Sequence, residues 1–155
     1  MTAKRTILDF IGGDQGRKGL AAIEFAILGP LLGLVLVCTT DLGLGIYRQM
    51  QVQTAAQVGA QYAAEHGYNA DAITSVVQGA ATGLVVSASP SPQQSCGCPG
   101  ASGVAPAICG TVCPDGNVAG VYVTVSAAGT YTTLIPYPVL PSQYALASRS
   151  TVRIQ

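Results

Sequence analysis

The feature that most constrains the fold is an apolar segment near the N-terminus. From Leu20 to Thr40 the chain has 21 residues with one charged side chain, Glu24. A helix that crosses a membrane needs about 20 predominantly apolar residues. A small soluble domain, by contrast, has little use for a helix that is apolar on every side. The segment therefore predicts a single transmembrane helix.

Two other kinds of apolar N-terminal segment are disfavoured. A cleaved secretory signal peptide has a short apolar region that ends at a site of small residues, whereas this run continues into an alanine-rich helical pattern. A lipoprotein site at Cys38 is disfavoured because the bulky Val37 precedes it. Cys38 is therefore expected to be an inert, small hydrophobic residue of the span.

The basic residues around this segment predict its orientation. Lys4, Arg5, Arg17 and Lys18 precede it, and only Arg48 follows it closely. Loops rich in Lys and Arg stay in the cytoplasm. We expect an inner-membrane protein that crosses the bilayer once, with its N-terminus in the cytoplasm and its C-terminal domain in the periplasm or outside the cell.

Composition and motifs argue against nucleic-acid binding and catalysis. The net charge is zero, only 9% of residues are charged, and no basic stripe appears. The single histidine, His66, follows Glu65 without a nucleophile motif, and no phosphate-binding glycine motif or C-x-x-C pair is present. We expect a protein that is not an enzyme, binds no nucleic acid and needs no cofactor.

Four cysteines cluster in the part of the chain predicted to lie outside the cytoplasm. Cys96, Cys98, Cys109 and Cys113 fall within 18 residues. In an oxidising compartment an even number of cysteines indicates disulfides, here two with three possible connectivities. Pairing of Cys96 with Cys98 would close a strained ring, so the two cross-linked connectivities are preferred and both stay open. Four thiolates could instead bind zinc, but the compartment disfavours a metal site.

The chain divides into four predicted parts. Residues 1–19 form a polar cytoplasmic leader, 20–40 the transmembrane half of a long helix, 41–66 its outer half, and 67–155 a small α+β domain. If the helix is unbroken from Leu20 to His66, its 47 residues span about 70 Å.

Three residues within the span affect helix packing. Pro30 is expected to kink the helix, because it lacks a backbone N–H. Gly29 and Gly33 form a G-x-x-x-G pair, which lets two helix backbones approach closely. Gly and Pro are also common in membrane helices in general. These residues therefore have two interpretations: they form a specific packing face, or they have no specific packing role.

Beyond the span, the sequence predicts further helical and extended elements. A narrow face of mostly small residues is suited to packing on a sheet or on other helices; it comprises Ile46, Met50, Val52, Ala56, Gly59, Ala60 and Ala63. A second helix is expected from Asn69, its N-cap, to about Gly83, with an apolar stripe at Ile73, Val76, Val77 and Ala80.

Strand signals dominate the C-terminal half. Residues 84–89 form a short β-rich run, 90–117 are expected to be loop, and Val121, Val123 and Val125 alternate with polar residues. Residues 131–135 and 144–154 complete the predicted strands. In the last one, Leu146, Val152 and Ile154 are expected on one face, and Arg149 and Arg153 on the other. The expected fold is α+β, with an antiparallel sheet of three or four strands packed on the outer half of the long helix.

The residues around the N-terminal end of the span resemble a known processing site. Gly19-Leu20 followed by Glu24-Phe25 is similar to the prepilin peptidase site of the Flp/Tad branch of type IV pilins. The wider run resembles the N-terminal signature of TadE-like proteins, which are minor pilins or pseudopilins of tight-adherence pilus systems. The matching positions are Glu24-Phe25, Pro30, Asp41, Tyr47 and the Gln/Ala-rich stretch up to about residue 64.

The resemblance implies a type IV-pilin-like protein with a role in pilus assembly or priming, and hence in surface attachment. Prepilin peptidase is expected to cut the Gly19–Leu20 bond, and Glu24 to pair with the new α-amine of a neighbouring subunit. Implied partners are the peptidase, other pilin subunits and the inner-membrane assembly platform. Two features depart from the family pattern: Leu42 replaces an aromatic residue, and the four-cysteine loop is not a family feature.

Other interpretations remain open. Glu24 is also explained as a carboxylate that the helix dipole favours and that reaches back to water. Asp41 is expected to mark the outer boundary of the span. As a whole, the chain is alternatively an uncleaved, membrane-tethered module whose disulfide-stapled loop binds a surface or ligand. A major filament subunit is disfavoured, because Flp major pilins are far shorter.

Overall fold

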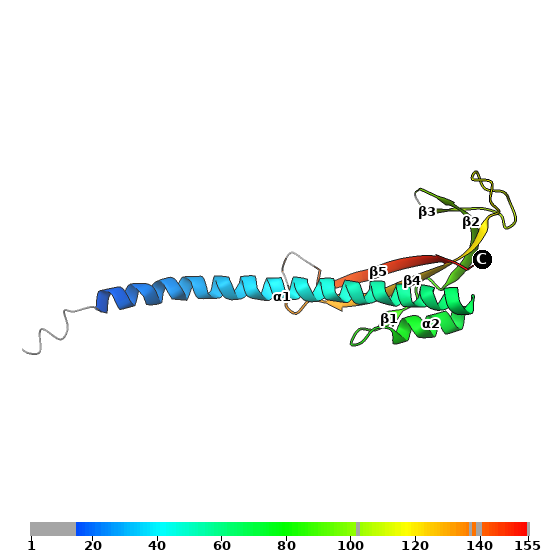
Figure 1. Ribbon diagram of the computed structural model, residues 1–155. Coiled ribbons are helices and arrows are strands. Elements are labelled where there is room, and N and C mark those ends of the chain that lie inside the picture. Colours follow the sequence, from blue (N-terminus) through cyan, green and yellow to red (C-terminus); the bar gives the residue numbers. More distant parts are fainter. Residues whose placement is uncertain (1–14, 102, 137, 139–140, 155) are drawn as a thin grey trace, which may run out of the picture. The chain divides into compact units, whose positions relative to one another are not determined.

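The computed structural model describes residues 15–101, 103–136, 138 and 141–154 (Figure 1). Positions 1–14 of the predicted leader, which include the basic residues Lys4 and Arg5, lie outside the described residues. The chain separates into two compact units, residues 1–42 and residues 43–155. As predicted, the fold is α+β, with a long N-terminal apolar helix and an antiparallel sheet packed on its outer part.

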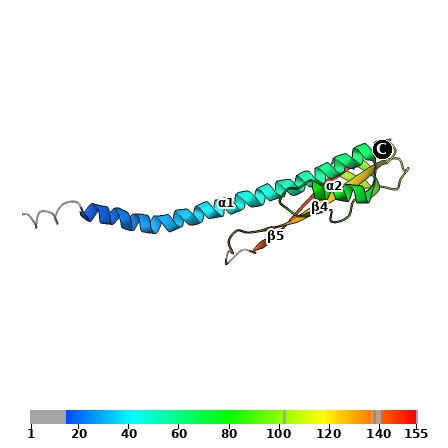
Figure 2. The ribbon, with the colours of Figure 1, turned by 90° about the horizontal axis from the view of Figure 1, so that it is seen from below.

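Helix α1 runs from Gln15 to His66 and has 52 residues (Figure 2). It begins five residues before the expected start at Leu20 and is assigned as α-helix without a break through Pro30. Its end agrees with the prediction. Gly67 adopts a left-handed conformation with φ of 81°, and its N–H donates to the Ala63 carbonyl at 3.0 Å. A glycine in this conformation is a common end to a helix.

Helix α2 covers Ala70–Gly79 and starts where the sequence predicts. The side chain of Asn69 accepts a hydrogen bond from the Ala72 N–H at 3.1 Å, so Asn69 is the N-cap. Ile73 and Val77 are fully buried. The helix ends four residues before the expected stop at Gly83, which lies in the following turn with φ of 72°.

In the described part of the chain, five antiparallel strands form one sheet around the long strand β4, so the expected three or four strands are too few. They are β1 (Val86–Ser87), β2 (Gln93–Gly100), β3 (Gly103–Pro106), β4 (Gly120–Thr132) and β5 (Gln143–Arg153). One edge of β4 pairs with β5 from Tyr122↔Arg153 to Thr132↔Gln143. The other edge pairs with β2 near one end and with β1 near the other, and β3 pairs with the outer edge of β2.

Two strand predictions are wrong in their bounds. The stretch from Pro90 to Asn117 is not all loop, because it contains β2 and β3. These strands have many Gly and Pro residues and no alternation, and they are strands because they pair with β4 and with each other. The segment predicted as a separate strand at Tyr131–Ile135 is partly the end of β4, which runs to Thr132.

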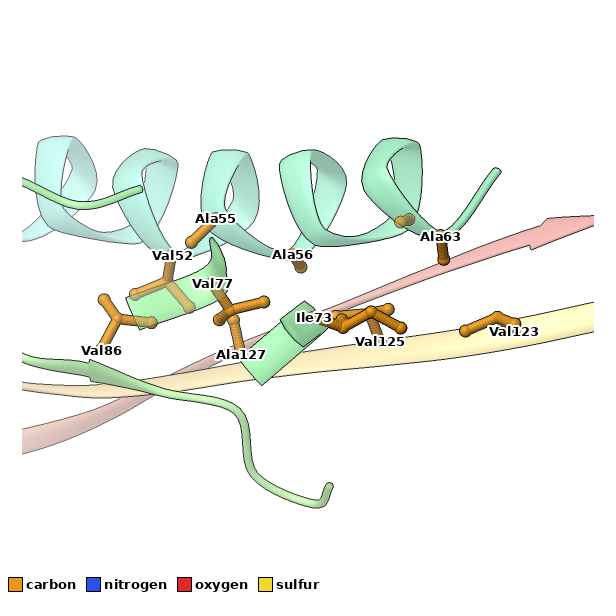
Figure 3. Close-up of a cluster of buried hydrophobic side chains, with 11 residues drawn as sticks. Val52, Ala55, Ala56, Ala63, Ile73, Val77, Val86, Val123, Val125 and Ala127 are labelled. Atoms are coloured by element: carbon orange, nitrogen blue, oxygen red, sulfur yellow. The ribbon is translucent and has the colours of Figure 1, made fainter. Parts of the chain in front are cut away.

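The core joins the outer half of α1, helix α2 and strand β4 (Figure 3). Its fully or nearly fully buried members are Val52, Ala55, Ala56, Ala60, Ala63, Ile73, Val77, Val86, Val123, Val125 and Ala127. The predicted small-residue face of α1 is therefore correct from Val52 onward. It is wrong at Ile46 and Met50, whose side chains are 58% and 60% exposed.

The alternation predicted for the strands is confirmed in β5 and only in part in β4. In β4, Val123 and Val125 are fully buried and the intervening Thr124 is half-buried, as expected. The prediction is wrong at the other positions, because Val121 is also half-buried and Tyr122 and Ser126 are buried. On β5, Leu146 and Val152 pack against the core, as does Ile154 just beyond the strand, whereas Arg149 and Arg153 are exposed. Side chains at every second position share one face of a strand, so β4 and β5 present a single apolar face to the helices.

At Gly59 the backbone of α1 lies very close to the side chains of this core. A Cβ atom at position 59 would lie 2.6 Å from Val77 Cγ2 and 2.9 Å from Val125 Cγ1. Both neighbours are β-branched side chains with few alternative rotamers, so neither can move away easily. Glycine is thus required here by space.

We predict that Gly59→Ala lowers the free energy of unfolding by about 1–3 kcal/mol, because the added methyl group overpacks the core. The matched control is Gly79→Ala, at the exposed end of α2, where an added Cβ meets nothing within 4 Å. Thermal unfolding of the full chain in detergent, followed by circular dichroism, measures both. A midpoint for Gly59→Ala equal to that of the control would contradict the packing argument.

Candidate functional site

The first part of α1 presents an apolar surface on every side. Its large side chains are between 50% and 75% exposed, namely Ile23, Phe25, Ile27, Leu28, Leu31, Leu32, Leu34, Val35 and Leu36. One stretch of this helix is long and apolar enough to cross a membrane, with a mean hydropathy of 2.2. Apolar surface that surrounds a helix is suited to lipid or to other apolar helices rather than to water.

Polar side chains near the end of this apolar stretch are satisfied within the helix. Thr39 Oγ1 donates to the carbonyls of Val35 and Leu36 at 3.0 and 2.9 Å, and Thr40 Oγ1 donates to the Leu36 carbonyl at 2.8 Å. In an apolar medium an unpaired hydroxyl is costly. These bonds therefore allow both threonines to lie in lipid.

Glu24 is the only charged residue between Lys18 and Asp41. Its side chain and that of the adjacent Phe25 are exposed. Glu24 comes four residues, about one helical turn, after Leu20 in the chain. The carboxylate is thus presented by the helix surface and is available to a group on another molecule.

The predicted processing bond lies inside α1. Gly19 and Leu20 have helical backbone, four and five residues after the helix start at Gln15. The bond is therefore accessible to a protease only where the first turns of α1 open. Terminal turns of helices fray readily, and glycine weakens the helix further.

The predicted packing glycines form a shallow notch on the helix surface. The Phe25 ring lies over Gly29, since a Cβ at position 29 would be 3.8 Å from its Cε1. A Cβ at Gly33 would meet no atom within 4 Å among the described residues. Phe25, Gly29 and Gly33 are spaced four apart and share a face, with Pro30 beside them. Two small residues four apart let a second helix approach closely; the notch is open at Gly33 and is partly covered by the Phe25 ring at Gly29.

Asp41 differs from the other polar residues of this half of α1. Only 4% of its surface is exposed, although Leu42 beside it is 68% exposed. The sequence pattern predicted Asp41 only as a marker of the outer boundary of the span. It did not indicate that the residue is buried.

The four clustered cysteines form two disulfides, as predicted. Cys96 is bonded to Cys109 and Cys98 to Cys113, with Cα–Cα distances of 5.1 and 5.6 Å. This is one of the two connectivities that the sequence left open. Cys38 is a free, partly buried thiol. Because the sulfur atoms are bonded to each other, these cysteines have no thiolate to offer a zinc ion.

The disulfides hold a loop with exposed apolar residues against the β2–β3 hairpin. Ile108, Val112 and Val118 are 79%, 71% and 58% exposed. Gly97, between the first two cysteines, lies against β3, since a Cβ there would be 2.7 Å from the Ala105 carbonyl oxygen. Hydrogen bonds from Asn117 lower the pKa of Asp115 below its usual value of 3.8 and order the turn.

The histidine at the end of α1 has an ordinary structural environment. The His66 ring stacks on Tyr62 with 4.3 Å between ring centroids. Its Nδ1 is 3.3 Å from the Tyr62 carbonyl oxygen. Within the described residues, no cluster of three His, Cys, Asp or Glu side chains is placed to hold a metal ion.

Polar contacts between α1 and the rest of the C-terminal unit were not predicted from sequence. Gln49 Nε2 donates to the Ala147 carbonyl of β5 at 3.0 Å, and Gln51 Nε2 donates to the Thr82 carbonyl at 3.1 Å. The only signal for them is the number of glutamines in this part of the helix, which does not identify their partners. Both bonds attach the helix to backbone carbonyls of the C-terminal unit.

The comparisons with known proteins agree with the resemblance of the N-terminal segment. The sequence model of the family described as TadE-like protein matches residues 19–61. That range includes the predicted processing bond, Glu24-Phe25, the glycine notch and the beginning of the packed face. No curated protein and no solved structure shows significant similarity to the chain.

We predict that Cys96→Ala combined with Cys109→Ala lowers the free energy of unfolding by about 2–4 kcal/mol, because the loop is no longer constrained in the unfolded state. Cys38→Ala is the control and should leave both disulfides intact. Non-reducing peptide mass mapping of the purified full chain reads the pairing, and thermal unfolding reads the stability. Recovery of a Cys96–Cys113 peptide from the wild type would contradict the connectivity.

Proposed function

We propose that this chain, whose residues 19–61 are TadE-like, is a minor pilin or pseudopilin that assembles or primes a Flp/Tad-type pilus. The observation that carries the proposal is the apolar first part of α1. It has one carboxylate, Glu24, near its beginning and a packing notch at Gly29 and Gly33. Such a helix can be stored in a membrane and can later pack against identical or related helices.

The membrane orientation in this proposal has the N-terminus in the cytoplasm and residues 43–155 on the other side. Two observations support it. Basic residues are concentrated before the apolar segment. The two disulfides require an oxidising compartment, which the cytoplasm of most cells is not.

Processing would begin at the membrane surface. Arg17 and Lys18 are attracted to the anionic headgroups of the inner leaflet and hold the Gly19–Leu20 bond near them. Prepilin peptidase then cuts this bond after the first turns of α1 open. The mature chain begins at Leu20 with a new α-amine, one helical turn before Glu24.

Assembly uses the charge that processing creates. In a bundle of such helices the Glu24 carboxylate pairs with the α-amine of a neighbouring subunit. Each ion is costly to remove from water alone, and pairing offsets that cost while it fixes the register of adjacent helices. The glycine notch lets the backbones come close enough for the pair to form. The expected partners are the peptidase, other pilin subunits and the inner-membrane assembly platform.

A membrane-tethered binding module is the second candidate function. The exposed Ile108, Val112 and Val118 on a disulfide-stapled loop favour it, because a rigid apolar surface is suited to recognition. In that case the N-terminal segment serves only as an anchor and is not cleaved.

Sequencing the N-terminus of the membrane-extracted protein separates the two functions. We expect the wild type to begin at Leu20, and Gly19→Val to retain the intact N-terminus because the peptidase requires a small residue before the cut. Gly12→Val, in the leader, is the control and should be processed normally. A wild-type chain that still begins at Met1 in cells with active prepilin peptidase would support the tethered module instead.

Removal of the carboxylate tests the pairing step. We expect Glu24→Ala to be cleaved normally but to reduce the number of pili per cell by about tenfold or more, as expected if one charged interaction of about 1.5–3 kcal/mol is lost. Glu65→Ala removes an exposed carboxylate at the far end of α1 and should change neither quantity. Electron microscopy of cells counts the pili. Normal piliation in Glu24→Ala would exclude the pairing role.

A further inference from the structure

A cavity of about 270 Å³ lies in the C-terminal unit between α1, the turn after α2 and the end of β4. Leu44 and Arg48 of α1 line it, together with Leu84, Thr130, Tyr131 and Leu134. Among the described residues that line the cavity, Arg48 is the only charged one. The cavity therefore combines a cationic group with leucine side chains and a threonine hydroxyl.

The Arg48 guanidinium is held in place by uncharged groups. It donates to Gln51 Oε1 at 3.0 Å and to the Thr82 carbonyl at 3.4 Å, and its carbon lies 5.9 Å from the centre of the Tyr47 ring. Gly83 gives it room, since a Cβ there would be 3.4 Å from one of its nitrogens. None of these neighbours neutralises the charge. A guanidinium has five N–H donors, so it can also bind an anion from the cavity side.

The position of Arg48 along α1 suggests which anion this is. Arg48 follows Thr40, the last residue of the apolar segment, by eight residues, which is about 12 Å along a helix. Side chains on a helix tilt toward its N-terminus, here toward the apolar segment. The headgroup layers add about 5–8 Å on each side of the hydrocarbon core. An arginine at this height can reach the level of the lipid phosphates.

We propose that this cavity binds the phosphate of an anionic phospholipid, with Arg48 as its cationic partner. A guanidinium matches two phosphate oxygens at once and binds them by charge-assisted hydrogen bonds. Leu44, Leu84 and Leu134 provide apolar surface for the glycerol end of the acyl chains. With about 270 Å³, the cavity is small compared with a whole lipid, so only the headgroup end is expected to enter it. This inference rests on the membrane anchoring in the proposed function.

Native mass spectrometry of the full chain tests the site. The protein is released from detergent micelles that contain equal amounts of phosphatidylglycerol and phosphatidylcholine. We expect the wild type to retain one phosphatidylglycerol in preference to phosphatidylcholine, and Arg48→Gln to retain about tenfold less of it, as loss of a charged hydrogen bond predicts. Arg149→Gln, which removes an exposed arginine of β5 away from the cavity, is the matched control and should bind as the wild type does.

A second variant, Leu134→Glu, leaves Arg48 and its two hydrogen bonds in place. The Leu134 side chain lines the cavity and is 58% exposed. Leu134→Glu brings a negative charge to the cavity and should also reduce phosphatidylglycerol retention, without loss of the folded state as judged by circular dichroism. Equal retention by wild type, Arg48→Gln and Leu134→Glu would overturn the proposal.

Two further measurements distinguish a lipid site from a small-anion site, and failure of this inference from failure of the proposed function. Inorganic phosphate, added as a competitor, should not displace the lipid; displacement at millimolar concentration would overturn the lipid assignment in favour of a small-anion site. Membranes of the cells that produce each chain are tested for its insertion by alkaline extraction, before detergent is added. An inserted wild-type chain that retains no phosphatidylglycerol overturns this inference and leaves the proposed function intact, whereas a chain that is not inserted overturns both.

Discussion

The close contact between the outer half of α1 and β4 is the interaction on which the rest of the C-terminal unit depends. Gly59 and a run of alanines bring the helix backbone within reach of Val77 and Val125. Small residues bury little area each, at about 25 cal/mol per Å² of apolar surface. The core therefore depends on tight packing over its whole length and has no large aromatic side chain among its fully buried members.

A core of this kind explains why two disulfides lie where they do. The β2–β3 hairpin and the loop after it contribute little to the apolar cluster, apart from the buried Cys96 and Cys113. Short segments without a core of their own are commonly stabilised by covalent links. The disulfides thus order a region that packing alone would leave loose, and they present Ile108 and Val112 on its surface.

Helix α1 serves two environments with one regular backbone. Its first part offers exposed leucine, isoleucine and valine side chains, and its last part offers buried alanines. The two parts differ in the size of their side chains. Large apolar side chains are suited to lipid contact, and small ones to close packing on a sheet. Glu24 and the notch at Gly29 and Gly33 belong to the first part, and their roles in assembly remain predictions.

Local patterns in the sequence determined the apolar span, the end of α1 at Gly67, the cap of α2 at Asn69 and the alternation along β5 and part of β4. Each depends on residues that are close together in the chain. Tertiary structure alone decided which cysteines pair, that Gln93–Gly100 and Gly103–Pro106 are strands, that Asp41 is buried, and that Arg48 lies beside a cavity. The bonded cysteines are 13 and 15 residues apart, and Thr82 is 34 residues from Arg48. Spacing along a single chain does not specify such partners, because several pairings fit the same spacing.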